Sequence, residues 1–121
     1  MKGRRLVGIV LAIALLTGAH AQEILKKDMR FSSARAALLR HGWQPLRMHA
    51  ASVAASEREV LEKTLIRHGI VEVDSCSVDA GSLCNFFYKR DDSCMRVMTR
   101  GEQLKDLRVR YWETLSACPV A

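Results

Sequence analysis

Apolar residues follow two different periods along the chain. From Ser33 to His41 and again from Ser56 to His68 they recur at every third or fourth position, which predicts two helices with one apolar side each. Ser56, with Glu59 three residues later, has the spacing of a capping box at the start of the second helix. From residue 70 onward apolar and polar residues alternate, which predicts strands.

The triplet Arg-His-Gly occurs at 40–42 and at 67–69, each time where a predicted helix ends. A glycine there can adopt the left-handed conformation that terminates helices, and basic residues suit the negative end of the helix dipole. The triplet also resembles the start of the catalytic motif of histidine phosphatases. In that family it follows a strand of a much larger α/β domain with a second catalytic histidine, so we interpret both copies as helix ends.

Four alternating segments follow the helices: IVEVDSCS at 70–77, LCNFFYKR at 83–90, CMRVMTR at 94–100 and LRVRYWETLS at 107–116. The stretches between them are short and rich in turn residues, which forces neighbouring strands to run antiparallel. Pro45 restricts the segment WQPLRMH to an edge strand or an extended connection. The sequence therefore predicts an α+β fold, with two helices packed on one face of a four-stranded antiparallel meander.

The strand period also sorts side chains onto two faces of the sheet. The apolar parity, expected beneath the helices, comprises Val71, Val73, Phe86, Tyr88, Met95, Val97, Leu107, Val109 and Tyr111. The other parity comprises Glu72, Asp74, Phe87, Lys89, Arg96, Met98, Arg108, Arg110 and Trp112. Two short helices cover only one face, so we expect the second face to be charged, with aromatic residues embedded in it.

The first 21 residues have the pattern of a secretory signal: a basic start, an apolar run at 6–16, and Ala19 and Ala21 framing a cleavage site. The run is shorter than the roughly twenty residues that span a bilayer. We expect residues 1–21 to be removed and 22–121 to form a single domain, in the periplasm or outside the cell. Three of the positive charges behind the formal net charge of +6 lie in the signal, so the mature domain is only weakly basic.

All four cysteines, Cys76, Cys84, Cys94 and Cys118, follow the signal. An even number in a small exported domain indicates two disulfides, and no C-x-x-C pair supports a zinc site instead. We favour 76–84 with 94–118 over the other two connectivities, because Cys94 and Cys118 lie at the same end of adjacent strands. Cys76 and Cys84 flank the first hairpin with unlike parity, so their pairing also requires a bulge or a departure from strand geometry at the hairpin tip.

The uncovered sheet face is the candidate binding surface, with Phe87, Arg96, Arg108, Arg110 and Trp112 as its proposed contact residues. Arginine and tryptophan offer large contact areas and are enriched at binding hot spots. The alternative is an ordinary solvated face, on which the arginines pair across strands with Glu72 and Asp74.

No motif for catalysis or cofactor binding occurs: there is no P-loop, G-x-G-x-x-G, H-E-x-x-H, EF-hand or G-x-S-x-G pattern. Asp74, Asp79, Asp91 and Asp92 lie in or beside predicted turns, where aspartate is favoured by turn geometry. We therefore predict no catalytic residue, no metal site and no cofactor. A basic, aromatic sheet can also bind nucleic acid, but export disfavours that partner.

Four motifs occur in order across the mature chain: GWQP at 42–45, VEVDSC at 71–76, CNFFY at 84–88 and VMTRGE at 97–102. Together they resemble a group of uncharacterised small secreted or periplasmic proteins of Gram-negative bacteria. The resemblance implies export and an α+β architecture, and it carries over no activity and no functional residue.

These patterns predict a non-catalytic binding module that recognises another envelope or secreted protein through the basic and aromatic sheet face. One alternative is the binding of an anionic envelope component through the same arginines. The other is a small secreted hydrolase, which would need His41 or His68 beside a carboxylate or hydroxyl in a pocket.

Overall fold

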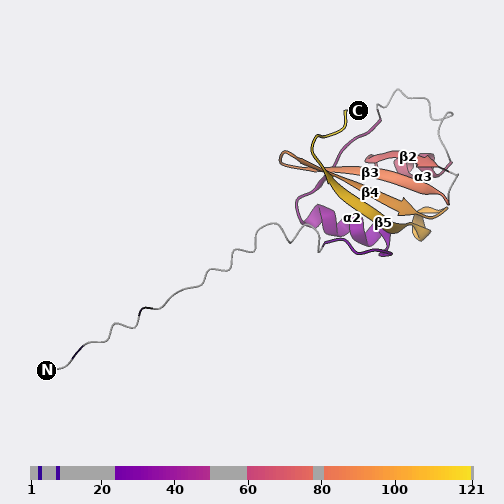
Figure 1. Ribbon diagram of the computed structural model, residues 1–121. Coiled ribbons are helices and arrows are strands. Elements are labelled where there is room, and N and C mark those ends of the chain that lie inside the picture. Colours follow the sequence, from indigo (N-terminus) through magenta and orange to yellow (C-terminus); the bar gives the residue numbers. More distant parts are fainter. Residues whose placement is uncertain (1–2, 4–7, 9–23, 50–59, 78–80, 121) are drawn as a thin grey trace.

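The computed structural model describes residues 3, 8, 24–49, 60–77 and 81–120, so most of the predicted signal lies outside the described residues (Figure 1). The elements are, in order, α2 (Phe31–Arg40), β1 (Gln44–Pro45), α3 (Val60–Arg67), β2 (Val73–Ser77), β3 (Leu83–Arg90), β4 (Ser93–Arg100), the 3-10 helix η2 (Leu104–Asp106) and β5 (Arg108–Leu115). The α+β class is confirmed, with two α-helices and a five-stranded antiparallel sheet in the described chain. Neither of these helices is long and apolar enough to cross a bilayer.

The sheet has one strand more than the predicted four. β1 pairs with the end of β3, with Gln44 opposite Lys89 and Pro45 opposite Tyr88. The order is β1-β3-β4-β5, and β2 pairs with the other half of β3. Proline is tolerated here because an edge strand need not donate every ladder hydrogen bond. A two-residue strand is too short to show a period in the sequence. The prediction of a four-stranded sheet is therefore wrong, because it lacked β1.

Helix α2 begins at Phe31, ahead of the predicted Ser33. The Phe31 N–H donates to the carbonyl oxygen of Leu107 at 2.9 Å. The Phe31 ring stacks on Phe86 with 4.2 Å between ring centroids. No side chain caps the helix at its N-cap residue, Arg30. Tertiary contacts therefore set the start of α2, in place of the serine cap that the sequence suggested.

Both Arg-His-Gly triplets end helices, as predicted. Gly42 has φ +85° and Gly69 has φ +78°, the left-handed region in which glycine is favoured. The N–H groups of Trp43 and Ile70 then donate back into the last helical turn, at 3.0 Å each. The predicted beginning of the second helix, with its capping box at Ser56 and Glu59, lies outside the described residues.

The core lies between the helices and one face of the sheet (Figure 1). Its buried residues are Leu25, Phe31, Ala34, Leu38, Trp43, Leu65, Ile70, Val73, Cys84, Phe86, Tyr88, Met95, Val97, Leu107 and Val109. The predicted apolar parity is confirmed from Val73 to Val109. Two of its members differ, because Val71 is only half-buried and Tyr111 is exposed.

A bulge in β5 places two aromatic side chains on the sheet faces opposite to those predicted for them. Arg110 is the extra residue: Tyr111 lies opposite Met98 and Trp112 lies opposite Val97. Trp112 therefore packs against the core, whereas Tyr111, 48% exposed, faces outward. The prediction that placed Tyr111 in the core and Trp112 on the uncovered face is wrong, because one inserted residue reverses the parity of everything beyond it.

Both favoured disulfides are present, Cys76–Cys84 and Cys94–Cys118. The register of β2 shifts once along β3, which places Cys76 directly opposite Cys84. The bulge that this pairing required is thus confirmed.

Candidate functional site

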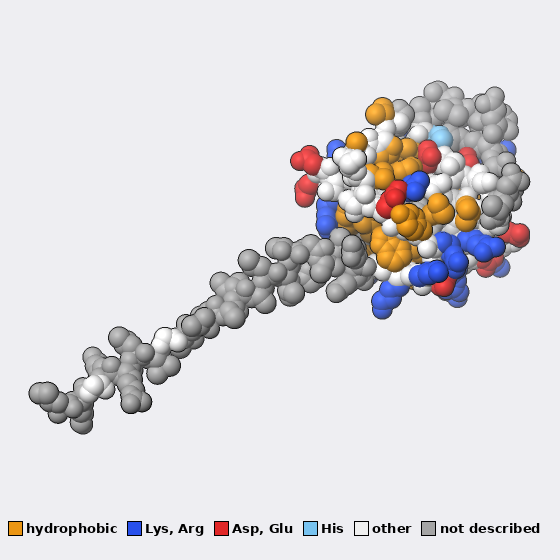
Figure 2. Space-filling view, viewed as in Figure 1, with side chains coloured by type: hydrophobic (Ala, Val, Ile, Leu, Met, Phe, Trp, Pro, Cys, Tyr) orange, Lys and Arg blue, Asp and Glu red, His pale blue; other side chains and the backbone are white. Residues whose placement is uncertain are grey.

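The sheet surface opposite the helices comprises Asn85, Phe87 and Lys89 of β3, Arg96 and Met98 of β4, and Tyr111 and Glu113 of β5. We call this surface the outer face. Most of its side chains are half-buried, and both helices contribute their buried residues to the core on the other side. In the space-filling view, hydrophobic side chains gather where β5 crosses the domain, with an acidic and a basic side chain among them (Figure 2).

Arg96, Glu113 and Tyr111 form a connected group on the outer face, which we call the exposed trio. Arg96 Nη2 lies 2.8 Å from Glu113 Oε1, and the Tyr111 hydroxyl donates to Glu113 Oε2 at 3.0 Å. The hydrogen bond to Glu113, and the negative charge of that carboxylate, raise the pKa of Tyr111. Tyr111 is exposed and the Arg96 and Glu113 side chains each keep a third of their accessible surface, so water screens this ion pair and it contributes little to stability.

The predicted contact residues divide between the two sides of the sheet. Phe87 and Arg96 belong to the outer face, and Arg108 lies on the same side, opposite Arg100. Arg110 occupies the bulge and donates from Nη1 to Asp28 Oδ1 at 2.6 Å, which fastens the N-terminal segment to β5. Trp112 faces the core, so only the first three residues share the predicted surface.

Tyr111 is the outer-face residue that the sequence interpretation placed in the core; Asn85 and Glu113 were not assigned to either face. The available signal was Glu113, an acidic residue one strand away from Arg96. Pairing those two side chains requires them to share a face, and that requires a bulge between Leu107 and Glu113.

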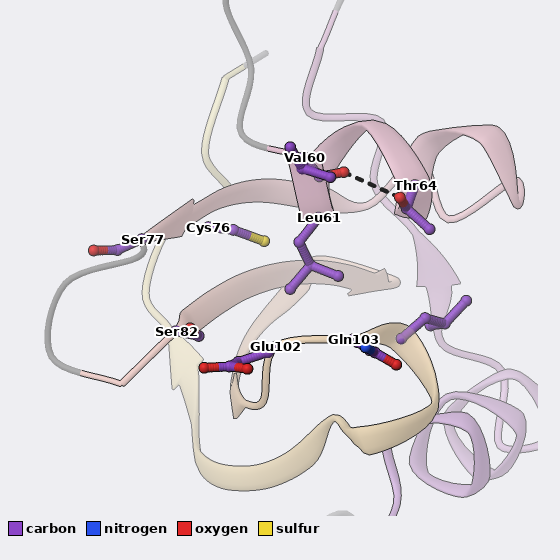
Figure 3. Close-up of a pocket in the computed structure, with 9 residues that line it drawn as sticks. Val60, Leu61, Thr64, Cys76, Ser77, Ser82, Glu102 and Gln103 are labelled. Carbon is purple, nitrogen blue, oxygen red and sulfur yellow. Dashed lines mark hydrogen bonds between the residues drawn. The ribbon is translucent and has the colours of Figure 1, made fainter.

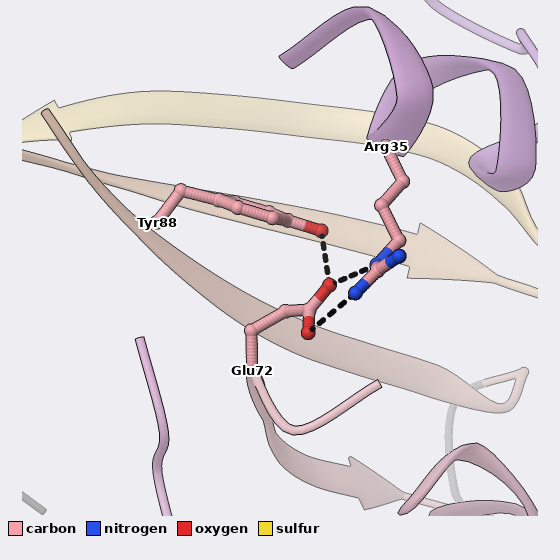
Figure 4. Close-up of polar contacts among 3 residues, drawn as sticks. All are labelled: Arg35, Glu72 and Tyr88. Atoms are coloured by element: carbon pink, nitrogen blue, oxygen red, sulfur yellow. Dashed lines mark hydrogen bonds and ion pairs between the residues drawn. The ribbon is translucent and has the colours of Figure 1, made fainter. Parts of the chain in front are cut away.

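The alternative, in which the arginines pair with Glu72 and Asp74, is wrong, because Arg96 pairs with Glu113 and Arg110 with Asp28. Glu72 is buried under α2, where Arg35 Nε and Nη2 donate to its two oxygens and the Tyr88 hydroxyl donates to Oε1 at 3.0 Å (Figure 4). We call these residues the buried trio. Burial, the charge of Glu72 and the hydrogen bond to it raise the pKa of Tyr88 well above its ordinary value. Glu72 precedes β2, so strand alternation does not apply to it.

Two polar atoms on the outer face are inaccessible and have no hydrogen-bond partner in the described part of the chain. They are Asn85 Oδ1 and Arg96 Nε, one acceptor and one donor. Buried polar atoms are usually paired with protein or water. These two atoms are therefore unpaired polar groups that lie beneath the surface of the outer face.

The histidines offer no acid–base arrangement in the described chain. His41 and His68 are both exposed at helix ends, and the His68 ring lies 2.9 Å from the carbonyl oxygen of Thr64. The hydrolase alternative needed one of them beside a carboxylate or hydroxyl in a pocket, and neither is so placed. Within the described residues no group of histidine, cysteine, aspartate or glutamate is arranged to hold a metal ion.

A cavity of about 590 Å³ lies between α3, the ends of β2 and β3, and the loop after β4. Leu61 points from α3 towards the loop that carries Glu102 and Gln103 (Figure 3). Its lining is Val60, Leu61, Thr64, Cys76, Ser77, Ser82, Glu102, Gln103 and Leu104. The volume suits a small ligand, but the lining offers hydroxyl groups without a histidine or lysine to activate them.

No protein-family model, no curated protein and no solved structure matches this chain. The function is therefore inferred from the geometry of the sheet and its side chains, and the resemblance to small secreted proteins of Gram-negative bacteria stays a prediction.

Proposed function

We propose that this chain is an exported, disulfide-stabilised binding module without catalytic activity, which recognises another protein through the outer face of its sheet. The observation that supports this proposal best is the composition of that face. Aromatic, apolar and mutually paired charged side chains share a surface on which neither helix packs. The two disulfides favour an oxidising compartment, in agreement with the signal pattern of residues 1–21.

The chemistry of the outer face favours a protein partner with a mixed surface. Phe87, Met98 and Tyr111 supply apolar contact area, and Tyr111 is the most accessible large side chain among them. Because Glu113 already compensates Arg96, a partner need not bring an opposite charge to that point. Its contact with the outer face can therefore rest on the apolar area of Phe87, Met98 and Tyr111.

Binding of an anion through Arg96, Arg108 and Arg110 has less support. Arg96 and Arg110 are each within 3 Å of a carboxylate oxygen, at Glu113 and Asp28. A ligand phosphate or carboxylate would have to displace those carboxylates, which weakens its net gain.

Site-specific photo-crosslinking in the exporting cell tests the proposal. A photoreactive residue replaces Tyr111 on the outer face, and the matched control carries it at Ser33, an exposed position of α2. We expect position 111 alone to form an adduct with a discrete protein, and we expect the adduct to form equally well when a periplasmic extract is irradiated at high salt, where purely ionic contacts weaken. Absence of any protein adduct, or identical adducts from both positions, would contradict recognition through this face.

A further inference from the structure

Three arginines stand side by side at one end of the sheet. Arg100 of β4 lies directly opposite Arg108 of β5, and Arg108 lies opposite Arg30 in the bridge that joins the N-terminal segment to β5. Residues paired in this way have Cα atoms about 4.5–5.5 Å apart and point to the same side of the sheet. All three side chains are exposed. We call this set the arginine row.

The arginine row works against folding. Like charges directly opposite each other on neighbouring strands are destabilising. Elsewhere Arg35, Arg96 and Arg110 each pair with a carboxylate. No ion pair joins any member of the row to a carboxylate within the described residues.

Two contacts hold members of the row in place without neutralising them. Arg108 Nη1 donates to the carbonyl oxygen of Asp28 at 3.2 Å, while the Asp28 carboxylate is taken by Arg110. The Arg100 guanidinium lies over Gly81, where a Cβ would come within 2.8 Å of Arg100 Nε. Gly81 has φ +94°, so both its conformation and its missing side chain make room for this arginine. The acidic residues nearest along the chain to Arg100 and Arg108 are Glu102 and Asp106, which are both exposed and form no ion pair with the row in the described chain.

We propose that the arginine row is a binding site for a phosphate group. Guanidinium groups form paired, charge-assisted hydrogen bonds to phosphate oxygens, and adjacent arginines can surround one phosphate or diphosphate. A bound anion also removes the repulsion that the empty row carries. The phosphate can belong to a free anion or to a lipid headgroup, since both present the same oxygens. This site uses none of the seven residues that define the outer face, although Arg108 lies on the same side of the sheet, and it does not depend on the proposed protein recognition.

Titration of the oxidised domain with inorganic pyrophosphate, followed by NMR of the backbone amides, tests the assignment. We expect saturable shifts centred on Arg30, Arg100 and Arg108. Arg100→Gln and Arg30→Gln should each weaken binding at least roughly tenfold, since each removes charge-assisted hydrogen bonds. Lys105→Gln, which removes an equal charge from an exposed position outside the row, should leave binding unchanged. Arg100→Gln should also melt at the same or a higher temperature, because it relieves repulsion.

A parallel titration with vesicles containing phosphatidylglycerol distinguishes the two sources of phosphate. Tighter binding to the vesicles than to pyrophosphate, lost in Arg100→Gln, assigns the site to a lipid headgroup; tighter binding to pyrophosphate assigns it to a free anion. The proposal is overturned if neither probe saturates, if Arg100→Gln binds like the wild type, or if polyglutamate binds equally well. Tyr111→Ala should keep pyrophosphate binding, so failure of the row and failure of the outer face as a protein site can be told apart.

Discussion

The same three residue types, arginine, glutamate and tyrosine, form a connected group on each face of the sheet. In the buried trio the Glu72 side chain is inaccessible to water, whereas in the exposed trio Glu113 retains a third of its accessible surface. Both carboxylates accept from one guanidinium and one phenol. The difference lies in their surroundings: strong local electrostatics fix the first group, and water screens the second.

The difference in burial separates polar groups that stabilise the fold from polar groups that can contact a binding partner. A buried carboxylate without its partners would carry a large desolvation cost, so the buried trio is constrained to one arrangement. The exposed trio can rearrange when a binding partner approaches, at little cost in free energy, because water can replace a hydrogen bond that its accessible side-chain atoms lose. Residue identity alone does not distinguish the two groups, and only their burial does.

The largest expected effect comes from breaking the buried trio. Glu72→Ala should lower the free energy of unfolding by about 3–5 kcal/mol, because it leaves the Tyr88 hydroxyl and part of the Arg35 guanidinium unpaired in the interior. The matched variant Glu113→Ala should cost less than about 1 kcal/mol. Urea unfolding of both variants measures the difference, and equal losses would show that the two trios do not differ as described.

The disulfides extend the comparison, because Cys84 lies on the core face and Cys94 on the opposite side of the sheet. Replacing either pair by alanine should cost about 2–5 kcal/mol. The loss should be larger for Cys94–Cys118, which closes 24 residues of sequence, than for Cys76–Cys84, which closes 8. Thermal melts report both values. A melting curve unchanged by reductant would count against the disulfide framework.

The two aromatic residues at the β5 bulge test the assignment of the faces. Trp112→Ala should cost about 1–3 kcal/mol, since a half-buried indole leaves the core edge. Tyr111→Ala should change stability by less than about 1 kcal/mol, because its ring is 48% exposed. Chemical unfolding of the two variants measures both losses. A larger loss of unfolding free energy for Tyr111→Ala than for Trp112→Ala would place Trp112 on the outer face.

The smallest effect should appear in alkaline titration of the two tyrosines. A rapid pH jump should ionise Tyr111 in the folded protein, at a pKa above its ordinary value, whereas Tyr88 should ionise only as the domain unfolds. A raised folded-state pKa contributes stability that is present below the unfolded pKa of about 10 and is lost as the pH rises further. Tyr88→Phe should therefore reduce the loss of stability above that pH. Tyrosinate absorbance with a single fast phase for both residues would oppose this interpretation.

Local signals in the sequence account for the features that were predicted correctly. The glycines after both helices, the alternation in β3 and β4 and the parity of the cysteines each depend on a few neighbouring residues. Phe31 shows where this fails, because its position at the start of α2 is set by contacts with Phe86 of β3 and with Leu107, which directly precedes β5, both far away in sequence.

The outer face was predicted only in part for a similar reason. Phe87 and Arg96 belong to β3 and β4, which pair without a register shift. Simple alternation along each strand therefore assigns both side chains to the correct face. The bulge at Arg110 depends on how β5 packs beside β4. It places Trp112 and Tyr111 each on the face opposite to the one predicted. Glu72 was misplaced because it precedes its strand, where alternation has no meaning.

The pairing of the N-terminal segment with β5 also sets an order of events in synthesis. The Asp28 N–H donates to the Val109 carbonyl oxygen at 2.7 Å, and Val109 donates back to Met29. The segment before α2 therefore pairs with β5, the last strand of the described chain, and contacts this distant in sequence form slowly. The backbone pairing of Asp28 and Met29 therefore cannot form during synthesis until Val109 has left the ribosome.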